Sequence, residues 1–259
     1  NYKMNQIFKE MYSRIRNKPI AELFVTPDGI NMKPPIPPYN SGRSKDWAHI
    51  DITKRNSREL CVQGQIVLSN SSAGFVCSPR SHLIYEDVLN KMGIGATNKS
   101  NWGKLEPEHY AEIREMVENI GGLWQIPIYV KKGSVILWFS STIHSAKHQE
   151  PPPFTACTTS YLGTSSDASN DLSNDASNES PWDGWRIVVY CCYRPMEDMT
   201  ASILKRMQRC NTENRSTNHW GNKMFSKTSR FYRSAEMNPQ MDRLIQHPEQ
   251  MSLNLNHNL

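Results

Sequence analysis

Short apolar segments separated by polar turns fill much of the chain between residues 47 and 193. Most of these segments are too short for ordinary helices, and their pattern is typical of β-strands. Few helical segments lie between them, which favours antiparallel sheets over the alternating strands and helices of a parallel sheet. The strands that we expect span residues 21–26, 47–52, 60–69, 74–79, 123–130, 134–139, 154–162 and 185–193.

Two connections follow from the spacing of these strands. The tight turn Lys131-Lys132-Gly133 joins strands 123–130 and 134–139. Residues 154–162 and 185–193 are expected to form another antiparallel pair. The segment between them, 163–181, repeats Asp-Ala-Ser-Asn and has one leucine as its only large apolar side chain. Such a segment cannot offset its ordering entropy by burial, so we expect a disordered insertion.

Apolar residues at helical spacing predict four helices. Residues 5–17 form an amphipathic pattern, and residues 85–92 a shorter one. Residues 107–120 begin with a proline, which suits the first helical position, and Gly121 follows as a stop signal. A last helix is expected at 200–209, with Ile203, Leu204 and Met207 facing inward.

Three regions follow from this pass along the chain. Residues 1–46 are expected to form a helix and an extended connector, rich in proline at 34–38, that pack on the core. Residues 47–195 form the β core and contain the 163–181 insertion. Residues 196–259 form a C-terminal helix and a basic polar tail.

The composition excludes several protein classes. No apolar run is long enough to cross a bilayer, and no signal peptide is visible. Six cysteines in 259 residues, without a CxxC pair, are too few for a disulfide scaffold. We therefore expect an intracellular, cytoplasmic protein. The net charge of +5 is concentrated between Lys205 and Arg233. We expect a solvated basic surface there, with contact to nucleic acid or an acidic partner as the alternative.

His49 and Asp51 lie two residues apart on an expected strand, so both side chains point to one face. A glycine turn and an apolar strand lead from Gly133 to a third candidate ligand, His144. Two histidines and one carboxylate on one side of a metal leave the other positions open, an arrangement typical of non-haem Fe(II) oxygenases. Zinc would more usually take cysteine or a third histidine.

Arg186 begins an otherwise apolar strand. A guanidinium at the start of a core strand needs an anion, and its planar fork suits a carboxylate bound through two hydrogen bonds. The alternative is a structural salt bridge to a carboxylate of the protein.

Together these elements resemble the phytanoyl-CoA dioxygenase family of Fe(II)- and 2-oxoglutarate-dependent oxygenases. Residues 61–68 and 74–82 are similar to the family's paired strands, which end in a Pro-Gly-Ser-His turn, with Arg80 in place of the glycine and Ala73 in place of a common asparagine. Residues 133–144 are similar to its element that ends in Ile-His. The segment Ser216-Thr-Asn-His-Trp220 is similar to a tail of some members. Arg186 follows His144 at an unusually long spacing, which the 163–181 insertion accounts for.

The resemblance implies a double-stranded β-helix, or jelly roll, with flanking helices. It implies that His49, Asp51 and His144 bind Fe(II), and that Arg186 pairs with the distal carboxylate of 2-oxoglutarate. O2 would be consumed, succinate and CO2 released, and a substrate hydroxylated. Gln63 and Gln65 share one face of their strand and are expected to contact the cosubstrate or metal-bound water, or else to form a cross-strand hydrogen bond.

The substrate is left open among three hypotheses. We expect a small-molecule or lipid-like substrate; the alternatives are an oxygenase that acts on nucleic acid or protein, and a catalytically silent jelly-roll module for binding or structure. The intact ligand set argues against the silent module. The remaining histidines of interest, His82, His109, His148 and His219, are expected to be structural or on the surface, with His148 as the second choice of ligand.

Overall fold

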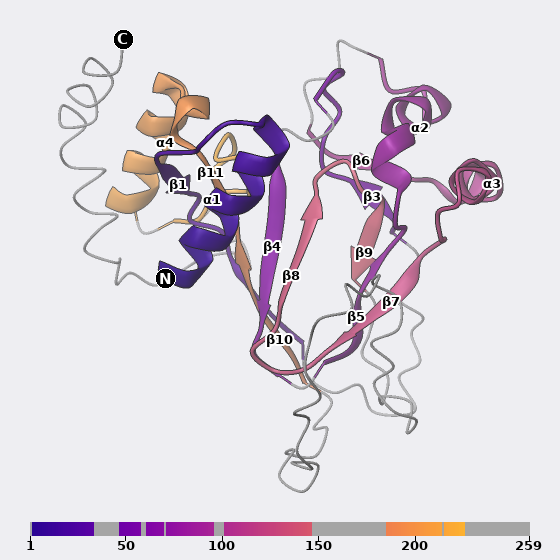
Figure 1. Cartoon of the computed structure of the whole chain (residues 1–259), viewed down its shortest axis with the longest axis horizontal. Coiled ribbons are helices and arrows are strands. Elements are labelled where there is room, and N and C mark those ends of the chain that lie inside the picture. The colour runs from indigo at the N-terminus through magenta and orange to yellow at the C-terminus, as the bar shows by residue number, and fades with distance from the viewer. Residues whose placement is uncertain are drawn as a thin grey trace, which may run out of the picture.

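The computed structural model describes residues 2–33, 47–57, 61–69, 71–95, 101–146, 185–213 and 215–225. The proline-rich connector at 34–38, the expected strand at 154–162, the 163–181 insertion and His148 lie outside these residues. The described chain is mainly β-sheet with a few helices, as the spacing of the short apolar segments predicts (Figure 1). No helix among the described residues is long and apolar enough to span a membrane.

Four strands form the first antiparallel sheet, in the order β2-β10-β4-β8. They are β2 (Ile30–Lys33), β10 (Arg186–Cys191), β4 (Val62–Val67) and β8 (Val135–Phe139). β10 pairs with β2 on one side and with β4 on the other. The N-terminal region therefore supplies a strand to this sheet as well as a helix packed on it.

Five strands form the second antiparallel sheet, in the order β6-β3-β9-β5-β7. They are β6 (Gly103–Lys104), β3 (His49–Ile50), β9 (His144–Ala146), β5 (Ser71–Cys77) and β7 (Ile126–Val130). The inner faces of the two sheets meet through aromatic side chains. The rings of Phe75 on β5 and Trp138 on β8 lie 4.6 Å apart between centroids.

The turn at residues 131–133 connects the two sheets. It joins β7 to β8, but β7 pairs with β5 and β8 pairs with β4, so the joined strands are not paired with each other. Gly133 has a φ of 90°, a conformation that L side chains rarely adopt, and this lets the chain turn sharply between the layers. The local sequence predicts the turn, whereas the choice of partner depends on packing far along the chain.

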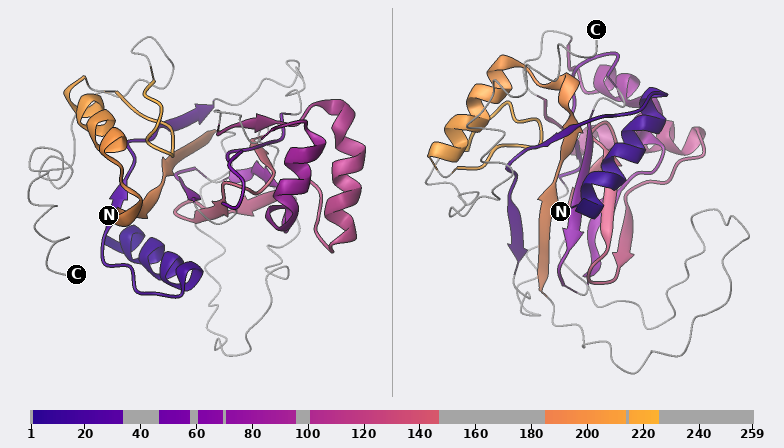
Figure 2. Two further views of the ribbon diagram at one scale, coloured as in Figure 1. Left: turned by 90° about the horizontal axis from the view of Figure 1, so that it is seen from above. Right: turned by 60° about the vertical axis from the view of Figure 1, so that its left-hand side comes forward.

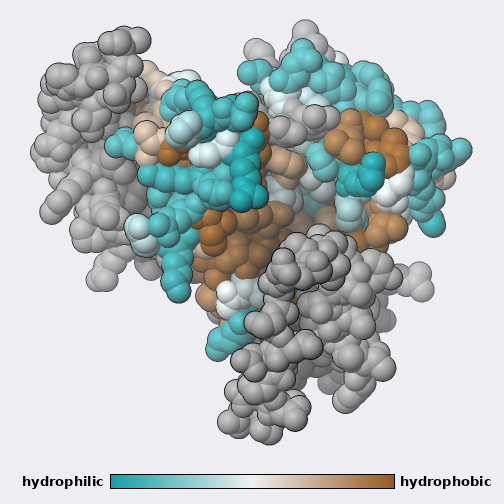
Figure 3. Space-filling model, in the orientation of Figure 1, coloured by the Kyte–Doolittle hydropathy of each residue, from teal (hydrophilic) through white to brown (hydrophobic). Residues whose placement is uncertain are grey.

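Helices cover the outer faces of the sheets (Figures 1 and 2). α1 (Tyr2–Arg16) buries Phe8 and Tyr12 against Val62 and Cys191 of the four-stranded sheet. Full burial of one such aromatic side chain contributes about 1.5–3 kcal/mol. Hydrophobic surface continues beside α1, over β4 and β8 (Figure 3).

The second sheet is covered by α2 (Tyr85–Lys91) and α3 (Tyr110–Asn119). Leu89 of α2 and Ile113 of α3 pack against Ile50 of β3 and against Ile143, the residue before β9. The helix expected to begin at Pro107 starts with a 3-10 turn, Pro107–His109, and continues as α3. Gly121, with a φ of 71°, follows the end of the helix.

The C-terminal helix, α4 (Ala201–Thr212), lies beside a separate two-stranded sheet of β1 (Leu23–Val25) and β11 (Tyr193–Pro195). Ile203 and Met207 are buried against Phe24 of β1, whereas Leu204, which was expected to face inward, is only partly buried. Thr200 caps the helix by accepting a hydrogen bond from the Ile203 N–H at 3.2 Å.

Candidate metal centre

The two histidines of the predicted ligand set lie opposite each other on neighbouring strands. β3 and β9 are antiparallel, and His49 is the register partner of His144. Side chains opposite each other in a sheet point to the same face, and the two imidazole centroids are 4.2 Å apart.

Asp51 reaches the same point from just beyond the end of β3. The strand expected at 47–52 is only two residues long, so strand periodicity alone does not position Asp51. Its backbone is held instead by two hydrogen bonds. Its N–H donates to the carbonyl of Ser140 at 2.8 Å, and its carbonyl accepts from the indole N–H of Trp220 at 2.8 Å.

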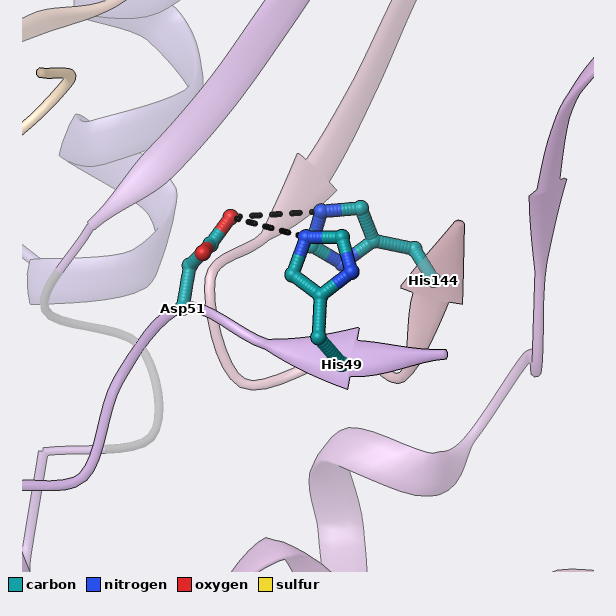
Figure 4. Close-up of side chains that lie close together, drawn as sticks. All are labelled: His49, Asp51 and His144. Atoms are coloured by element: carbon teal, nitrogen blue, oxygen red, sulfur yellow. Dashed lines mark ion pairs between the residues drawn. The ribbon is translucent and has the colours of Figure 1, made fainter. Parts of the chain in front are cut away.

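The three side chains converge on one small volume (Figure 4). Asp51 Oδ2 lies 3.2 Å from His144 Nε2 and 3.7 Å from His49 Nε2. One ligand atom from each residue lies within 4.8 Å of the others, and all three residues are buried. Their arrangement could hold a metal ion.

The hydrogen bonds of the imidazoles present the correct nitrogen to this volume. His49 Nδ1 lies 3.0 Å from the carbonyl of Trp47, and His144 Nδ1 lies 2.9 Å from the carbonyl of Thr142. Because a carbonyl oxygen only accepts, both Nδ1 atoms carry the proton in the neutral imidazole. The lone pairs on Nε2 then face Asp51, the orientation that a metal ligand needs.

The protonation states of His144 and Asp51 also suit a metal. Burial and the neighbouring His49 lower the pKa of His144, so its imidazole is neutral near pH 7. Burial by itself would raise the pKa of Asp51, but the nearby histidines, His49 first, outweigh it and hold that pKa well below its ordinary value. The site thus pairs an ionised carboxylate with a neutral imidazole donor, the states that coordinate metals.

Gln63 supports the ligand set from β4. Its amide Nε2 donates to Asp51 Oδ2 at 2.9 Å and to Ser140 Oγ at 3.1 Å. It therefore restrains the carboxylate of Asp51, and the expected contact of Gln63 with cosubstrate or metal-bound water stays a prediction.

Arg186 is 2% exposed and lines the same cavity as the ligand set. Its guanidinium donates to Asn31 Oδ1 at 2.7 Å and to Gln65 Oε1 at 3.3 Å, and both of these acceptors are uncharged. Within the described residues no carboxylate forms a salt bridge with it, which argues against the structural salt bridge considered from the sequence. A buried guanidinium with no carboxylate partner in the described part of the chain could bind an anion.

The cavity that contains these groups has a volume of about 640 Å³. It lies within the usual range for a small-molecule site. Gln63, Gln65 and several aromatic side chains also line it.

Two elements of the cavity were not expected from the sequence. His219 was assigned to the structure or the surface, but it lines the cavity, next to the buried Trp220 that holds Asp51. Burial lowers the pKa of His219 to about 4, despite the attraction of Asp51. Asp28, from the loop after β1, lines the cavity as well. The only signal for His219 in the sequence is the similarity of residues 216–220 to a tail of some family members.

Two other histidines lie away from the ligand set, as expected. His82 packs against the ring of Phe139 at 5.2 Å, and His109 ends the 3-10 turn before α3. The chain matches no protein-family model, and a search of curated proteins finds no similar sequence.

Proposed function

We propose that the chain is an Fe(II)- and 2-oxoglutarate-dependent oxygenase on a double-stranded β-helix (jelly roll), as its resemblance to the phytanoyl-CoA dioxygenase family implies. One observation carries the proposal. A set of two histidines and one carboxylate, and a buried arginine with no carboxylate partner in the described chain, line one cavity.

The donor set and Arg186 together favour iron over zinc. Structural zinc sites usually use cysteine, and catalytic zinc sites use three histidines or two histidines and a carboxylate. Two histidines and one carboxylate with open positions also suit non-haem Fe(II), and Arg186 in the same cavity, which could bind an anionic cosubstrate, favours iron here. When iron, 2-oxoglutarate and O2 are bound, they supply oxidative decarboxylation to succinate and CO2, coupled to hydroxylation of a substrate.

The residues of the chain hold and orient these groups. His49 and His144 offer Nε2, and Asp51 offers Oδ2, which Gln63 restrains. Arg186 would bind the distal carboxylate of 2-oxoglutarate through its planar fork. Asn31 and Gln65 orient the guanidinium by accepting two of its hydrogen bonds.

A small-molecule substrate is the choice that the cavity supports. Its volume of about 640 Å³ accommodates the cosubstrate and a small molecule. The described part of the basic tract gives no comparable support to a nucleic-acid substrate, because Arg209 and Arg215 both form salt bridges with Glu213.

Anaerobic titration of the metal-free protein with Fe(II) and then with 2-oxoglutarate tests the proposal. We expect one equivalent of each to bind, with 2-oxoglutarate binding strengthened by the metal. Admission of O2 should then release succinate at a slow uncoupled rate, and a panel of small molecules should be screened for a faster one. A protein that binds Zn(II) tightly and gives no 2-oxoglutarate binding with any divalent metal would contradict the proposal.

A further inference from the structure

Asp28 lines the cavity of the metal-ligand set, yet the proposed function leaves it without a role. Its Oδ1 accepts a hydrogen bond from the Gly29 N–H at 2.8 Å. In the part of the chain that the structure describes, no lysine, arginine or histidine forms an ion pair with it. Burial raises the pKa of Asp28 to about 7, against the effect of the Gly29 hydrogen bond, and Asp51 raises it further. Among the described residues, this carboxyl group therefore has no cationic partner.

Asp28 and Arg186 both line the cavity, and their backbones lie at different points along β10. Arg186 begins this strand, whereas the residue after Asp28, Gly29, accepts a hydrogen bond from the Tyr190 N–H at 3.0 Å, near the end of the strand. A rise of about 3.3 Å per residue places the backbone of Tyr190 roughly 13 Å from that of Arg186. The guanidinium reaches back along the strand to Asn31 and Gln65, the register partners of Val188 and Tyr190. Within the described residues it forms no ion pair with Asp28, so the carboxyl group of Asp28 remains available to a second ligand.

The charged groups near Asp28 favour a cation over an anion as its ligand. Asp51 raises the pKa of Asp28, and a cation beside Asp28 would oppose this effect and favour the ionised carboxylate. Lys223 also lines the cavity, but its side chain is exposed to solvent, and within the described residues it forms no ion pair with Asp28. The ammonium of Lys223 can remain hydrated and leave Asp28 uncompensated.

Aromatic side chains line the cavity beside the metal ligands. Trp47 stacks on the ring of His49 at 4.5 Å, and Trp102, 46% exposed, lies 6.0 Å from the same ring. Aromatic faces attract cations and cover apolar carbon. The aromatic residues of the wall are Trp47, Phe75, Trp102, Trp138, Tyr190, Trp220 and Phe225.

We propose that the substrate is a small molecule with a protonated amine, which Asp28 binds while the aromatic wall covers its carbon skeleton. The role of this amine as the substrate rests on the proposed oxygenase function, whereas the binding of an amine at Asp28 does not. Charge complementarity assigns the dianionic cosubstrate to Arg186 and the cation to Asp28.

Calorimetric titration of the full chain, freed of metal with EDTA, tests the amine site separately from the oxygenase. The probes are cyclohexylamine, cyclohexanol and cyclohexanecarboxylate, which share a ring and differ in charge. We expect the amine to bind about tenfold or more tightly than the alcohol or the carboxylate, since only the amine brings a positively charged donor to Asp28. Asp28→Asn should lower amine affinity by the same factor and leave cyclohexanol unchanged, because asparagine still accepts from the Gly29 N–H. Asp87→Asn, an exposed position on α2, is the matched control.

Fe(II) and 2-oxoglutarate titrations on the same proteins separate the two failures. If the amine, alcohol and carboxylate bind equally, or if Asp28→Asn leaves amine binding intact, the amine site is refuted even where iron and 2-oxoglutarate bind. If the amine binds through Asp28 but no metal supports 2-oxoglutarate binding, the amine site stands and the oxygenase function fails.

Discussion

Gly74 leaves the space that the side chain of Arg186 occupies. A Cβ on Gly74 would lie 2.8 Å from both Cδ and Nε of Arg186, closer than real Cβ contacts allow. Arg186 is fully enclosed, so it has little room to withdraw. The position of the guanidinium in the cavity therefore depends on the absence of a side chain on the neighbouring sheet.

Gly74→Ala should weaken 2-oxoglutarate binding without weakening metal binding. The added methyl group pushes Arg186 away from Asn31 and Gln65, and such overpacking costs about 1–3 kcal/mol of stability. Thermal denaturation and anaerobic 2-oxoglutarate titration measure the two effects. A double-mutant cycle with Arg186→Ala is the control: once Arg186 is gone, the alanine at 74 should have no further effect on cosubstrate affinity.

Arg186→Ala should leave Fe(II) affinity near wild type and lower 2-oxoglutarate affinity some tens- to thousands-fold. The loss of one partner of a desolvated charge pair typically costs about 2–5 kcal/mol. Arg186→Lys should restore only part of the affinity, because an ammonium lacks the planar fork. Normal 2-oxoglutarate binding by both variants in an anaerobic titration would show that another cation holds the distal carboxylate.

Alanine at His49, Asp51 or His144 should abolish Fe(II) binding and succinate formation while the circular dichroism spectrum stays native. Backbone pairing of β3 with β9 builds the site, so the sheet does not need the metal to form. In the metal-bound protein we expect ligand distances of about 2.0–2.2 Å, the range for imidazole and carboxylate on zinc, an ion of similar size. Asp51→Glu keeps the charge but moves the carboxylate, and we expect weak binding and at most trace turnover.

The matched control for these variants is His82→Ala, which removes an imidazole outside the ligand set. If His82→Ala loses iron to the same extent, the effect is one of general stability. If any ligand variant keeps wild-type turnover, the three residues do not form the site.

Gln63→Leu should lower metal affinity by about 10- to 100-fold, the usual effect of removing an outer hydrogen bond to a ligand. Gln63 donates to the same oxygen of Asp51 that faces both histidines, so its loss frees the carboxylate to rotate. Competition with a chelator measures the affinity. Equal metal affinities for Gln63→Leu and the wild-type protein would exclude a role for Gln63.

Asp28 should make the metal-free protein less stable as the pH rises. Its pKa is raised to about 7, against an ordinary value of about 4, so between these values the folded protein keeps a proton that the unfolded chain has lost. The free energy of unfolding therefore receives its full contribution from this proton below about pH 4, falls as the pH rises through this window, and levels off above about pH 7.

Asp28→Asn removes this titration. Urea denaturation of the EDTA-treated proteins should show the variant gaining stability relative to wild type from pH 5 to pH 8. Parallel pH profiles for the two proteins would mean that Asp28 is not desolvated in solution.

The sequence predicts the β-rich architecture because short apolar segments and glycine turns are local signals. It also predicts where α1, α2 and α4 lie, to within a few residues. It does not predict that the turn at 131–133 connects different sheets, because that choice depends on which strands already have partners.

The candidate site shows the same division. The spacing of the motifs predicts His49 and His144 as metal ligands. Their convergence follows from the pairing of β3 with β9, which the spacing alone does not reveal. Asp51 was chosen by strand periodicity, although the Ser140 and Trp220 hydrogen bonds hold it in place. Asp28 and His219 were missed because they belong to loops, and a loop reaches a cavity only through tertiary packing.

The place of β10 between β2 and β4 has a consequence for synthesis on the ribosome. The three candidate metal ligands, His49, Asp51 and His144, are all translated before residue 145. The strand β10, which begins with Arg186, is translated later and inserts between β2 and β4, which precede it in the chain. Until it arrives, β2 lacks the partner that it has in the described part of this sheet, and β4 has one edge unpaired by β10, the kind of edge that pairs with other chains. A nascent chain thus carries the three candidate metal ligands before Arg186, and insertion of one late strand completes the four-stranded sheet of the described chain and adds Arg186 to the cavity.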